Sequence, residues 1–145
     1  MEAGSGARRG AGRNAEGPLV LIVDDVEESR TIYVLWLKFS GYRLAEAENG
    51  QEAVHQAHLL LPNIIVTDLS LPVMDGLEAT RRLKDDPRTK DIPVIALTGD
   101  VLPEHVEAAR RAGCDLVISK PCLPDQLEDA IQRILGAQEP GGDRA

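Results

Sequence analysis

Short apolar runs alternate with amphipathic helical patterns five times between residues 18 and 136, and this alternation strongly limits the possible folds. A continuous apolar run is typical of a strand that is buried on both faces of a parallel sheet. The segments that predict strands are 19–23, 42–47, 64–67, 94–97 and 116–118. A helix between two parallel strands returns the chain to the edge at which the next strand begins. The sequence therefore predicts an α/β fold built from βα units.

Residues that begin helices lie between these runs. Asn49 and Gly50 predict the start of one helix, and Asp75 predicts another because Glu78 follows three residues later, as in a capping box. Pro103 is typical of a first helical turn. With five strands joined by such helices, we expect a flavodoxin-like (βα)5 three-layer sandwich whose parallel strands have the order 2-1-3-4-5.

The two ends of the chain lack the alternation. Residues 1–17 are rich in Gly, Ala and Arg and predict a disordered tail, residues 137–145 predict a flexible tail, and 18–136 form one domain. The net charge of −8 disfavours direct contact with nucleic acid through a basic surface. No apolar run approaches the roughly 20 residues that cross a bilayer, and no signal peptide opens the chain. We therefore expect a cytoplasmic protein that contacts no membrane.

Charged or hydroxyl side chains follow four of the five predicted strands. Asp24 and Asp25 follow the first, Asp68 the third, Thr98 the fourth and Lys120 the fifth. Each Asp alone is equally consistent with a turn or a helix cap, and a lone lysine with a solvated surface. The carboxyl ends of parallel strands meet at one sheet edge, where ligands of such sheets bind. Convergence of all five side chains at that edge predicts a functional site.

The chemistry of this set points to phosphoryl transfer. Three neighbouring carboxylates repel one another, so they need a bound cation or raised pKa values. Hard oxygen ligands in an open, hydrated site suit Mg²⁺, which often bridges to phosphate. A lysine beside them supplies a point charge for a phosphoryl oxygen. A carboxylate nucleophile, a divalent metal and a lysine together predict transfer of a phosphoryl group to an aspartate.

Four stretches of the chain resemble the receiver domain of two-component response regulators, in particular stand-alone receivers of the chemotaxis kind. They are VLIVDD at 20–25, NIIVTDLSLPVMDG at 63–76, PVIALTGD at 93–100 and ISKP at 118–121. The resemblance implies a phosphoacceptor switch that takes its phosphoryl group from a sensor histidine kinase or a histidine phosphotransfer protein. It also implies signalling by protein–protein contact rather than enzyme activity, although such domains assist their own phosphorylation and dephosphorylation.

The resemblance also implies roles for individual residues. Asp68 would be the phosphoacceptor, and Lys120 would pair with the phosphoryl group. Mg²⁺ would be ligated directly by Asp25 and mainly through water by Asp24. The Asp68 carboxylate and the backbone carbonyl of Ser70 would complete the protein ligands of the metal.

Three further positions belong to the switch in this resemblance. The Thr98 hydroxyl would turn to bond the phosphoryl group in the active state, and Gly99 would leave the approach open. The Lys120–Pro121 peptide bond would be cis. Val117 departs from the family, which usually has Tyr, Phe or His three residues before the lysine. Because that aromatic side chain transmits phosphorylation to the outer surface, we expect an altered or weaker readout here.

The helix predicted after the first strand is apolar on more than one side. Tyr33 and Leu37 lie four residues apart, off its clearest apolar stripe, and are expected to be partly exposed. They either widen the buried face or form a docking surface, because receivers resemble one another in using this helix to meet a four-helix partner. The stripe that predicts the face toward the sheet consists of Ile32, Leu35, Trp36 and Phe39.

Other function classes remain as alternatives. The chain could be a phosphorylation-independent, receiver-like binding module. A phosphatase of the haloacid dehalogenase type also uses Asp, Mg²⁺ and Lys, but it usually carries Asp-x-Asp after its first strand, whereas here Ser70 stands two residues after Asp68. A flavin or nucleotide carrier would need a phosphate-binding loop after the first strand, where Asp24 and Asp25 repel phosphate.

Overall fold

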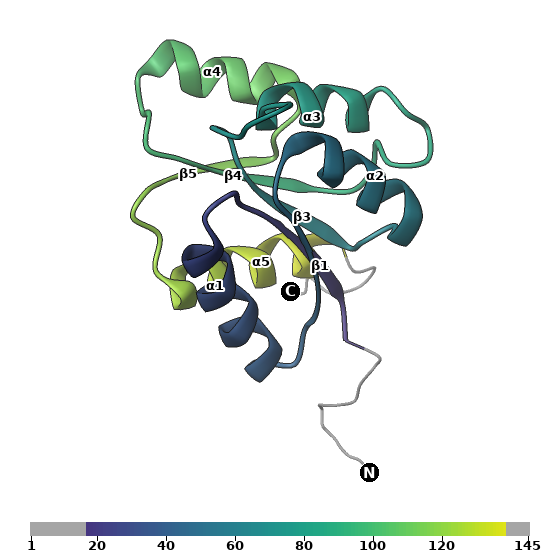
Figure 1. Cartoon of the computed structure of the whole chain (residues 1–145), viewed down its shortest axis with the longest axis vertical. Coiled ribbons are helices and arrows are strands. Elements are labelled where there is room, and N and C mark those ends of the chain that lie inside the picture. The colour runs from purple at the N-terminus through teal and green to yellow at the C-terminus, as the bar shows by residue number, and fades with distance from the viewer. Residues whose placement is uncertain (1–16, 139–145) are drawn as a thin grey trace.

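In the computed structural model, which describes residues 17–138, five parallel strands alternate with five helices (Figure 1). The strands are β1 (Leu19–Val23), β2 (Arg43–Ala47), β3 (Ile64–Asp68), β4 (Val94–Thr98) and β5 (Leu116–Ser119). The helices are α1 (Glu27–Phe39), α2 (Gly50–Leu60), α3 (Gly76–Lys84), α4 (Pro103–Ala112) and α5 (Pro124–Gln138). The sheet order is β2-β1-β3-β4-β5, and every pairing is parallel, which confirms the predicted flavodoxin-like fold.

The predicted tails are largely outside the described residues. Residues 1–16 and 139–145 are not described, so the expected disorder of these ends stays a prediction. The domain boundary expected at residue 136 falls inside α5, which continues to Gln138. Among residues 17–138, no helix combines the length and the apolar character that crossing a membrane requires.

The sheet is covered on both faces, as its apolar strands require. Figure 1 shows α1 and α5 on one side of the sheet and α2, α3 and α4 on the other. Along β1 the side chains alternate between the two sides, so Val20 and Ile22 pack with α1 and α5 while Leu21 and Val23 pack toward α2–α4. All four are at most 1% exposed. This core fixes the carboxyl ends of β1, β3, β4 and β5 at one edge of the sheet.

The helix termini expected from the sequence are observed. The side chain of Asn49 accepts a hydrogen bond from the Glu52 N–H at the start of α2, and Asp75 accepts one from the Glu78 N–H at the start of α3. Pro103 begins α4. These caps satisfy backbone donors that have no partner within the helix.

The predicted inner face of α1 is wrong. The stripe expected to face the sheet points to solvent, with Ile32 56%, Leu35 62%, Trp36 44% and Phe39 95% exposed. The buried side chains of α1 are instead Arg30, Val34 and Leu37. Arg30 can occupy the inner face because its guanidinium donates to the Asp24 backbone carbonyl at 2.6 Å and to the Glu46 carboxylate at 2.8 Å. A buried cation with partners of this kind is tolerated, and periodicity of apolar residues does not reveal such a face.

An ion pair between His58 on α2 and Asp86 makes part of the stability depend on pH. His58 Nε2 lies 2.8 Å from Asp86 Oδ2, and its Nδ1 lies 2.9 Å from the Val54 carbonyl oxygen. Two acceptors favour the doubly protonated ring, so the Asp86 hydrogen bond, and next the Val54 carbonyl, raise the pKa of His58. The stabilisation is therefore complete below the unfolded pKa of His58 and disappears as the pH rises through the higher folded pKa.

We expect His58→Gln to lower the melting temperature at about pH 6 by about 2 °C, as for a partly exposed pair, and to have less effect at about pH 9. Thermal unfolding of both proteins at the two pH values checks this. His55→Gln, on the exposed side of α2, is the matched control and should leave the melting temperature unchanged at both. An equal loss for His58→Gln at both pH values would contradict the role of the charged imidazole.

Candidate functional site

Three carboxylates meet at the carboxyl edge of the sheet. β1 and β3 are neighbours in the sheet, so Asp24 and Asp25, directly after β1, face Asp68 at the end of β3. One carboxylate oxygen from each residue lies within 4.8 Å of the others. Asp24 and Asp68 are buried, whereas Asp25 is exposed. The convergence expected from the sequence is present, and it leaves one open side toward solvent.

Asp24 is the most constrained of the three. Its Oδ1 accepts a hydrogen bond from the Val26 N–H at 2.9 Å, while its backbone carbonyl accepts one from Arg30. Burial raises the pKa of the Asp24 carboxyl, the Val26 hydrogen bond opposes that rise, and the charge of Asp68 adds to it. The fold therefore holds Asp24 in a position that disfavours its ionised form unless a cation is near.

Asp68 is held at both of its oxygens. The Lys120 ammonium donates to Oδ2 at 2.6 Å, and the Ser70 backbone N–H donates to Oδ1 at 3.1 Å. Lys120 follows β5, and its own backbone N–H donates to the Thr98 carbonyl at 2.8 Å. The Lys120–Pro121 bond is cis. The result is a buried carboxylate whose charge is balanced by one half-exposed ammonium.

The other three positions that the resemblance assigns to a switch lie on β4, on β5 and in the loop that follows β4. The Thr98 hydroxyl does not contact Asp68 but accepts a hydrogen bond from the Asp100 N–H at 2.9 Å. A Cβ atom at Gly99 would meet nothing within 4 Å, which is consistent with an open approach. Val117 on β5 is partly buried and packs on the side of the sheet that α2, α3 and α4 cover.

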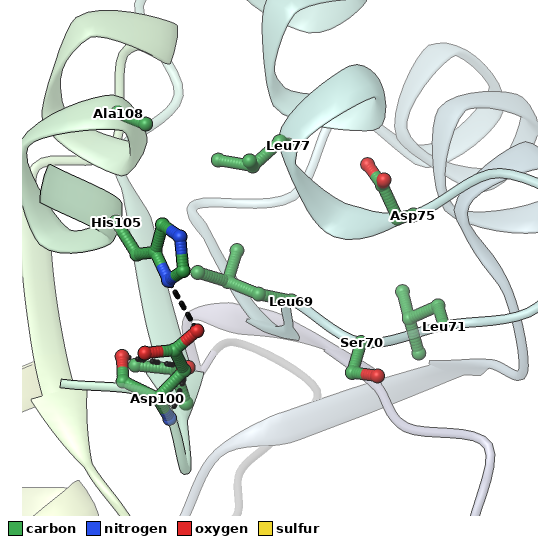
Figure 2. Close-up of a pocket in the computed structure, with 9 residues that line it drawn as sticks. Leu69, Ser70, Leu71, Asp75, Leu77, Asp100, His105 and Ala108 are labelled. Carbon is green, nitrogen blue, oxygen red and sulfur yellow. Dashed lines mark hydrogen bonds and ion pairs between the residues drawn. The ribbon is translucent and has the colours of Figure 1, made fainter. Parts of the chain in front are cut away.

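A pocket of about 450 Å³ lies between the loops that follow β3 and β4. Figure 2 shows Leu69, Ser70 and Leu71 on one side of this pocket and His105 of α4 on the other. His105 approaches the Asp100 carboxylate, and a dashed line in Figure 2 marks their contact. The Thr98 side chain also lines this pocket, whereas Asp24, Asp25 and Asp68 do not.

The structure separates Tyr33 and Leu37, the two residues for which the sequence left a docking surface open. Leu37 is 0% exposed and belongs to the core under α1, so its predicted partial exposure is wrong. Tyr33 is partly buried, and its hydroxyl donates to the Cys122 backbone carbonyl at 2.7 Å. Burial, together with nearby acidic groups, raises the pKa of Tyr33 to about 12, so the hydroxyl stays a donor. Tyr33 thereby ties α1 to the segment that carries Lys120.

If Asp68 accepts a phosphoryl group, as the resemblance implies, we expect Tyr33→Phe to slow this reaction severalfold, because the segment after Lys120 loses one of its anchors. The same change should lower the free energy of unfolding by about 1 kcal/mol, the usual effect of one buried hydrogen bond. Rates of phosphoryl-adduct formation by intact mass spectrometry and denaturant unfolding check the two effects. Tyr42→Phe removes the other tyrosine hydroxyl and is the control; an equal loss of rate in both variants would contradict a specific role of Tyr33.

The carboxylates have the chemistry of a site for a hard divalent cation. All three donors are oxygens, two are buried, and the third is open to solvent, where a metal could keep water ligands. The pKa of Asp24 is raised because burial and a neighbouring negative charge disfavour the bare carboxylate. The same two factors favour a bound cation. The residues present therefore fit a metal ion such as Mg²⁺.

We expect Asp24→Asn to raise the melting temperature of the metal-free protein by several degrees and to weaken the further rise caused by MgCl₂. Asparagine keeps an oxygen for the Val26 N–H but removes a buried charge and its repulsion from Asp68. Thermal unfolding with and without MgCl₂ measures both effects. Asp25→Asn, at the exposed position, is expected to weaken the Mg²⁺ effect with a smaller rise in the metal-free protein. A lower melting temperature for metal-free Asp24→Asn would contradict this account.

The sequence and the fold both match known proteins. Residues 20–132 match the response regulator receiver domain family. The polar-differentiation response regulator DivK of Brucella anthropi is 37% identical over 117 residues, which cover 81% of this chain and 95% of DivK.

Solved structures with the same fold include two receiver proteins of known type. The receiver domain of a sensor histidine kinase from Pseudomonas aeruginosa, with a magnesium ion coordinated in its active site cleft, has a TM-score of 0.77 and 32% identity, covering 83% of this chain and 98% of that one. The chemotaxis response regulator CheY4 of Vibrio cholerae also has a TM-score of 0.77, with 29% identity over 81% of this chain and 98% of its own. With the family match over residues 20–132, these similarities show that the chain belongs to the response regulator receiver domains.

Proposed function

We propose that this receiver domain is a cytoplasmic, Mg²⁺-dependent phosphoacceptor switch in which Asp68 is the acceptor. One observation carries the proposal: the buried Asp68 carboxylate lies within 4.8 Å of two other carboxylates and 2.6 Å from the Lys120 ammonium. This arrangement places a nucleophile, ligands for a divalent cation and a fixed positive charge at one point. Membership in the receiver family supports phosphoryl transfer from histidine over the alternative of a haloacid-dehalogenase-type phosphatase.

The proposed reaction uses the carboxylate as a nucleophile. An oxygen of Asp68 attacks the phosphorus of a phosphohistidine on a sensor kinase or a phosphotransfer protein, and an acyl phosphate forms. The phosphorus–nitrogen bond breaks, and its electron pair returns to the imidazole ring. Lys120 stabilises the negative charge on the phosphoryl oxygens. Mg²⁺, when bound by Asp24, Asp25, Asp68 and the Ser70 carbonyl, supplies further positive charge to the same oxygens.

The domain is proposed to assist its own dephosphorylation and to have no separate enzyme substrate. A water molecule attacks the phosphorus in line, inorganic phosphate leaves, and the Asp68 carboxylate is restored. Between the two reactions, the acyl phosphate shifts an existing equilibrium toward a state in which the Thr98 hydroxyl bonds the phosphoryl group. Gly99 leaves room for this approach. Since Val117 replaces the usual aromatic residue, the signal reaches the surface around β5 in a different or weaker form.

The exposed side of α1 is the proposed contact for the histidine-bearing partner. Its four large apolar side chains recur at helical spacing from Ile32, near the middle of α1, to Phe39, its last residue. An apolar stripe of this kind matches the surface of a helical bundle. The docking surface considered for Tyr33 and Leu37 from the sequence is therefore proposed instead for four other residues of α1, namely Ile32, Leu35, Trp36 and Phe39.

Intact mass spectrometry after incubation with acetyl phosphate and MgCl₂ tests the proposal. The expected result is one phosphoryl adduct that is absent when the metal is chelated, and that peptide mapping places within residues 63–76. Absence of an adduct under every condition would instead support a phosphorylation-independent binding module. Continuous turnover of a small phosphomonoester would support the phosphatase alternative.

A further inference from the structure

The hydroxyl of Thr98 forms two hydrogen bonds with one neighbour on the β4–α4 loop, which comprises residues 99–102. It accepts a hydrogen bond from the Asp100 N–H at 2.9 Å and donates to the Asp100 carbonyl at 3.3 Å. A hydroxyl has a single hydrogen, so the hydrogen bond to the Asp100 carbonyl must break before Thr98 can donate to a phosphoryl oxygen on Asp68. The strength with which Asp100 is held therefore influences how easily Thr98 turns.

Asp100 is held by its side chain from two directions. Its Oδ1 accepts a hydrogen bond from the Leu102 N–H at 3.2 Å, and its Oδ2 contacts Nδ1 of His105 in the first turn of α4. The Leu102 hydrogen bond, and next the His105 hydrogen bond, lower the pKa of the Asp100 carboxyl. Asp100 is therefore ionised near neutral pH, and His105 faces a charged acceptor.

Because Gly99 precedes Asp100, the contact between Asp100 and His105 is needed to fix the conformation of the β4–α4 loop. Gly99 separates Thr98 from Asp100, has no side chain, and would meet no atom within 4 Å if a Cβ were added. Glycine also allows more backbone conformations than any other residue. The loop is thus free to rearrange at residue 99, while α4 fixes its next residue through His105. Figure 2 shows the His105 ring directed at Asp100 across one end of the pocket.

We propose that His105 is a positioning residue that holds the β4–α4 loop in the inactive arrangement, with the Thr98 hydroxyl turned to Asp100 and away from Asp68. The contact of His105 with Asp100 opposes the state in which Thr98 bonds the phosphoryl group. The effect of this contact on phosphorylation rests on the proposed phosphoacceptor function. The orientation of Thr98, however, is a property of the unphosphorylated protein and can be measured separately.

Replacement of His105 separates this role from a general loss of structure. His105 is exposed, so His105→Ala should fold normally. His105→Asn is the matched control because its side-chain amide nitrogen occupies nearly the position of Nδ1 and still donates to Asp100. An exposed side-chain pair is a weak interaction, so we expect its removal to shift the equilibrium between the two Thr98 orientations by about two- to fivefold.

The first measurement is the side-chain dihedral angle χ1 of Thr98 by NMR scalar couplings in metal-free, unphosphorylated protein. One dominant rotamer is expected in the wild type and in His105→Asn, and averaged couplings are expected in His105→Ala. Identical couplings in all three proteins would overturn the proposal, and this outcome does not depend on whether Asp68 accepts a phosphoryl group. Averaged couplings in both variants would support the role of His105 and show that the imidazole itself is required, since the amide of asparagine would then not replace it.

The second measurement is the affinity for beryllium trifluoride, a phosphoryl mimic, in the presence of MgCl₂. We expect His105→Ala to bind the mimic about two- to fivefold more tightly than the wild type, and His105→Asn to bind it like the wild type. If all three proteins bind the mimic equally, phosphoacceptor function stands and the role of His105 is wrong. If the wild type does not bind the mimic at all, the proposed function itself fails, while the Thr98 couplings still decide the role of His105.

Discussion

Asp68→Asn is expected to abolish the phosphoryl adduct completely while the protein stays folded. Asparagine keeps an oxygen that accepts the hydrogen bond from the Ser70 N–H or from Lys120, so the local geometry has a close replacement. The amide is not a nucleophile at neutral pH, and the variant also lacks one of the three negative charges that would hold the cation. Intact mass spectrometry with acetyl phosphate, together with circular dichroism of the same samples, measures both outcomes.

Another aspartate provides the control for this change. Asp91 is exposed and lies just before the amino end of β4, at the edge of the sheet opposite the carboxylate cluster, so Asp91→Asn should form the adduct at the wild-type rate. An adduct of undiminished amount on Asp68→Asn would move the acceptor elsewhere, with Asp24 and Asp25 as the nearest carboxylates. Loss of folding in Asp68→Asn would show instead that the charge pair with Lys120 is structurally essential.

Gly50→Ala should be among the most destabilising single changes in this domain. The Gly50 N–H donates to the Met74 carbonyl at 2.8 Å, and a Cβ atom at residue 50 would lie 2.1 Å from that same oxygen. Both partners are backbone, so no side chain can turn aside to relieve the overlap. We expect a loss of about 2–4 kcal/mol in the free energy of unfolding, as for an overpacked core site. Denaturant unfolding checks this value.

Replacement of another helical glycine by alanine should raise the free energy of unfolding instead of lowering it. A Cβ atom at Gly136 in α5 would meet nothing within 4 Å, so Gly136→Ala should raise the free energy of unfolding by about 0.5–1 kcal/mol. Equal effects at both glycines would contradict the steric explanation. Because Met74 belongs to the loop between Asp68 and α3, Gly50→Ala should also slow adduct formation, whereas Gly136→Ala should not.

The sequence predicted the sheet and the site edge because both depend on local patterns that tertiary structure cannot easily override. A run such as that of β1 must be buried on both faces, and only a central parallel strand provides two buried faces. Once the strands are placed, the topology brings their carboxyl ends together, so Asp24, Asp68 and Lys120 converge without knowledge of side-chain packing.

The sequence did not predict which side of α1 is buried, because that choice depends on contacts with other elements. Counting apolar residues favours the stripe that contains Ile32 and Phe39 over a face that includes Arg30. The outcome is decided by Glu46 on β2 and by the Asp24 carbonyl, which together satisfy the Arg30 guanidinium. A basic residue between two apolar ones at helical spacing, with acidic residues on the next strand, is a signal that could have shown this arrangement.

Long-range hydrogen bonds of single side chains could likewise not be predicted from the sequence. Tyr33 lies 89 residues from Cys122, and no periodic pattern connects them. His105 is exposed on α4, and its contact with Asp100 depends on the path of the intervening loop. Such contacts require the positions of two separate backbone segments, which only the folded structure defines.

The exposed stripe of α1 has a consequence for the behaviour of the protein at high concentration. Four large apolar side chains on one helix form a surface that two molecules could share when no partner covers it. The net charge of −8 gives every molecule the same sign and keeps such surfaces apart in dilute buffer. Since salt shortens the range of this repulsion, self-association through the stripe is expected to increase with ionic strength.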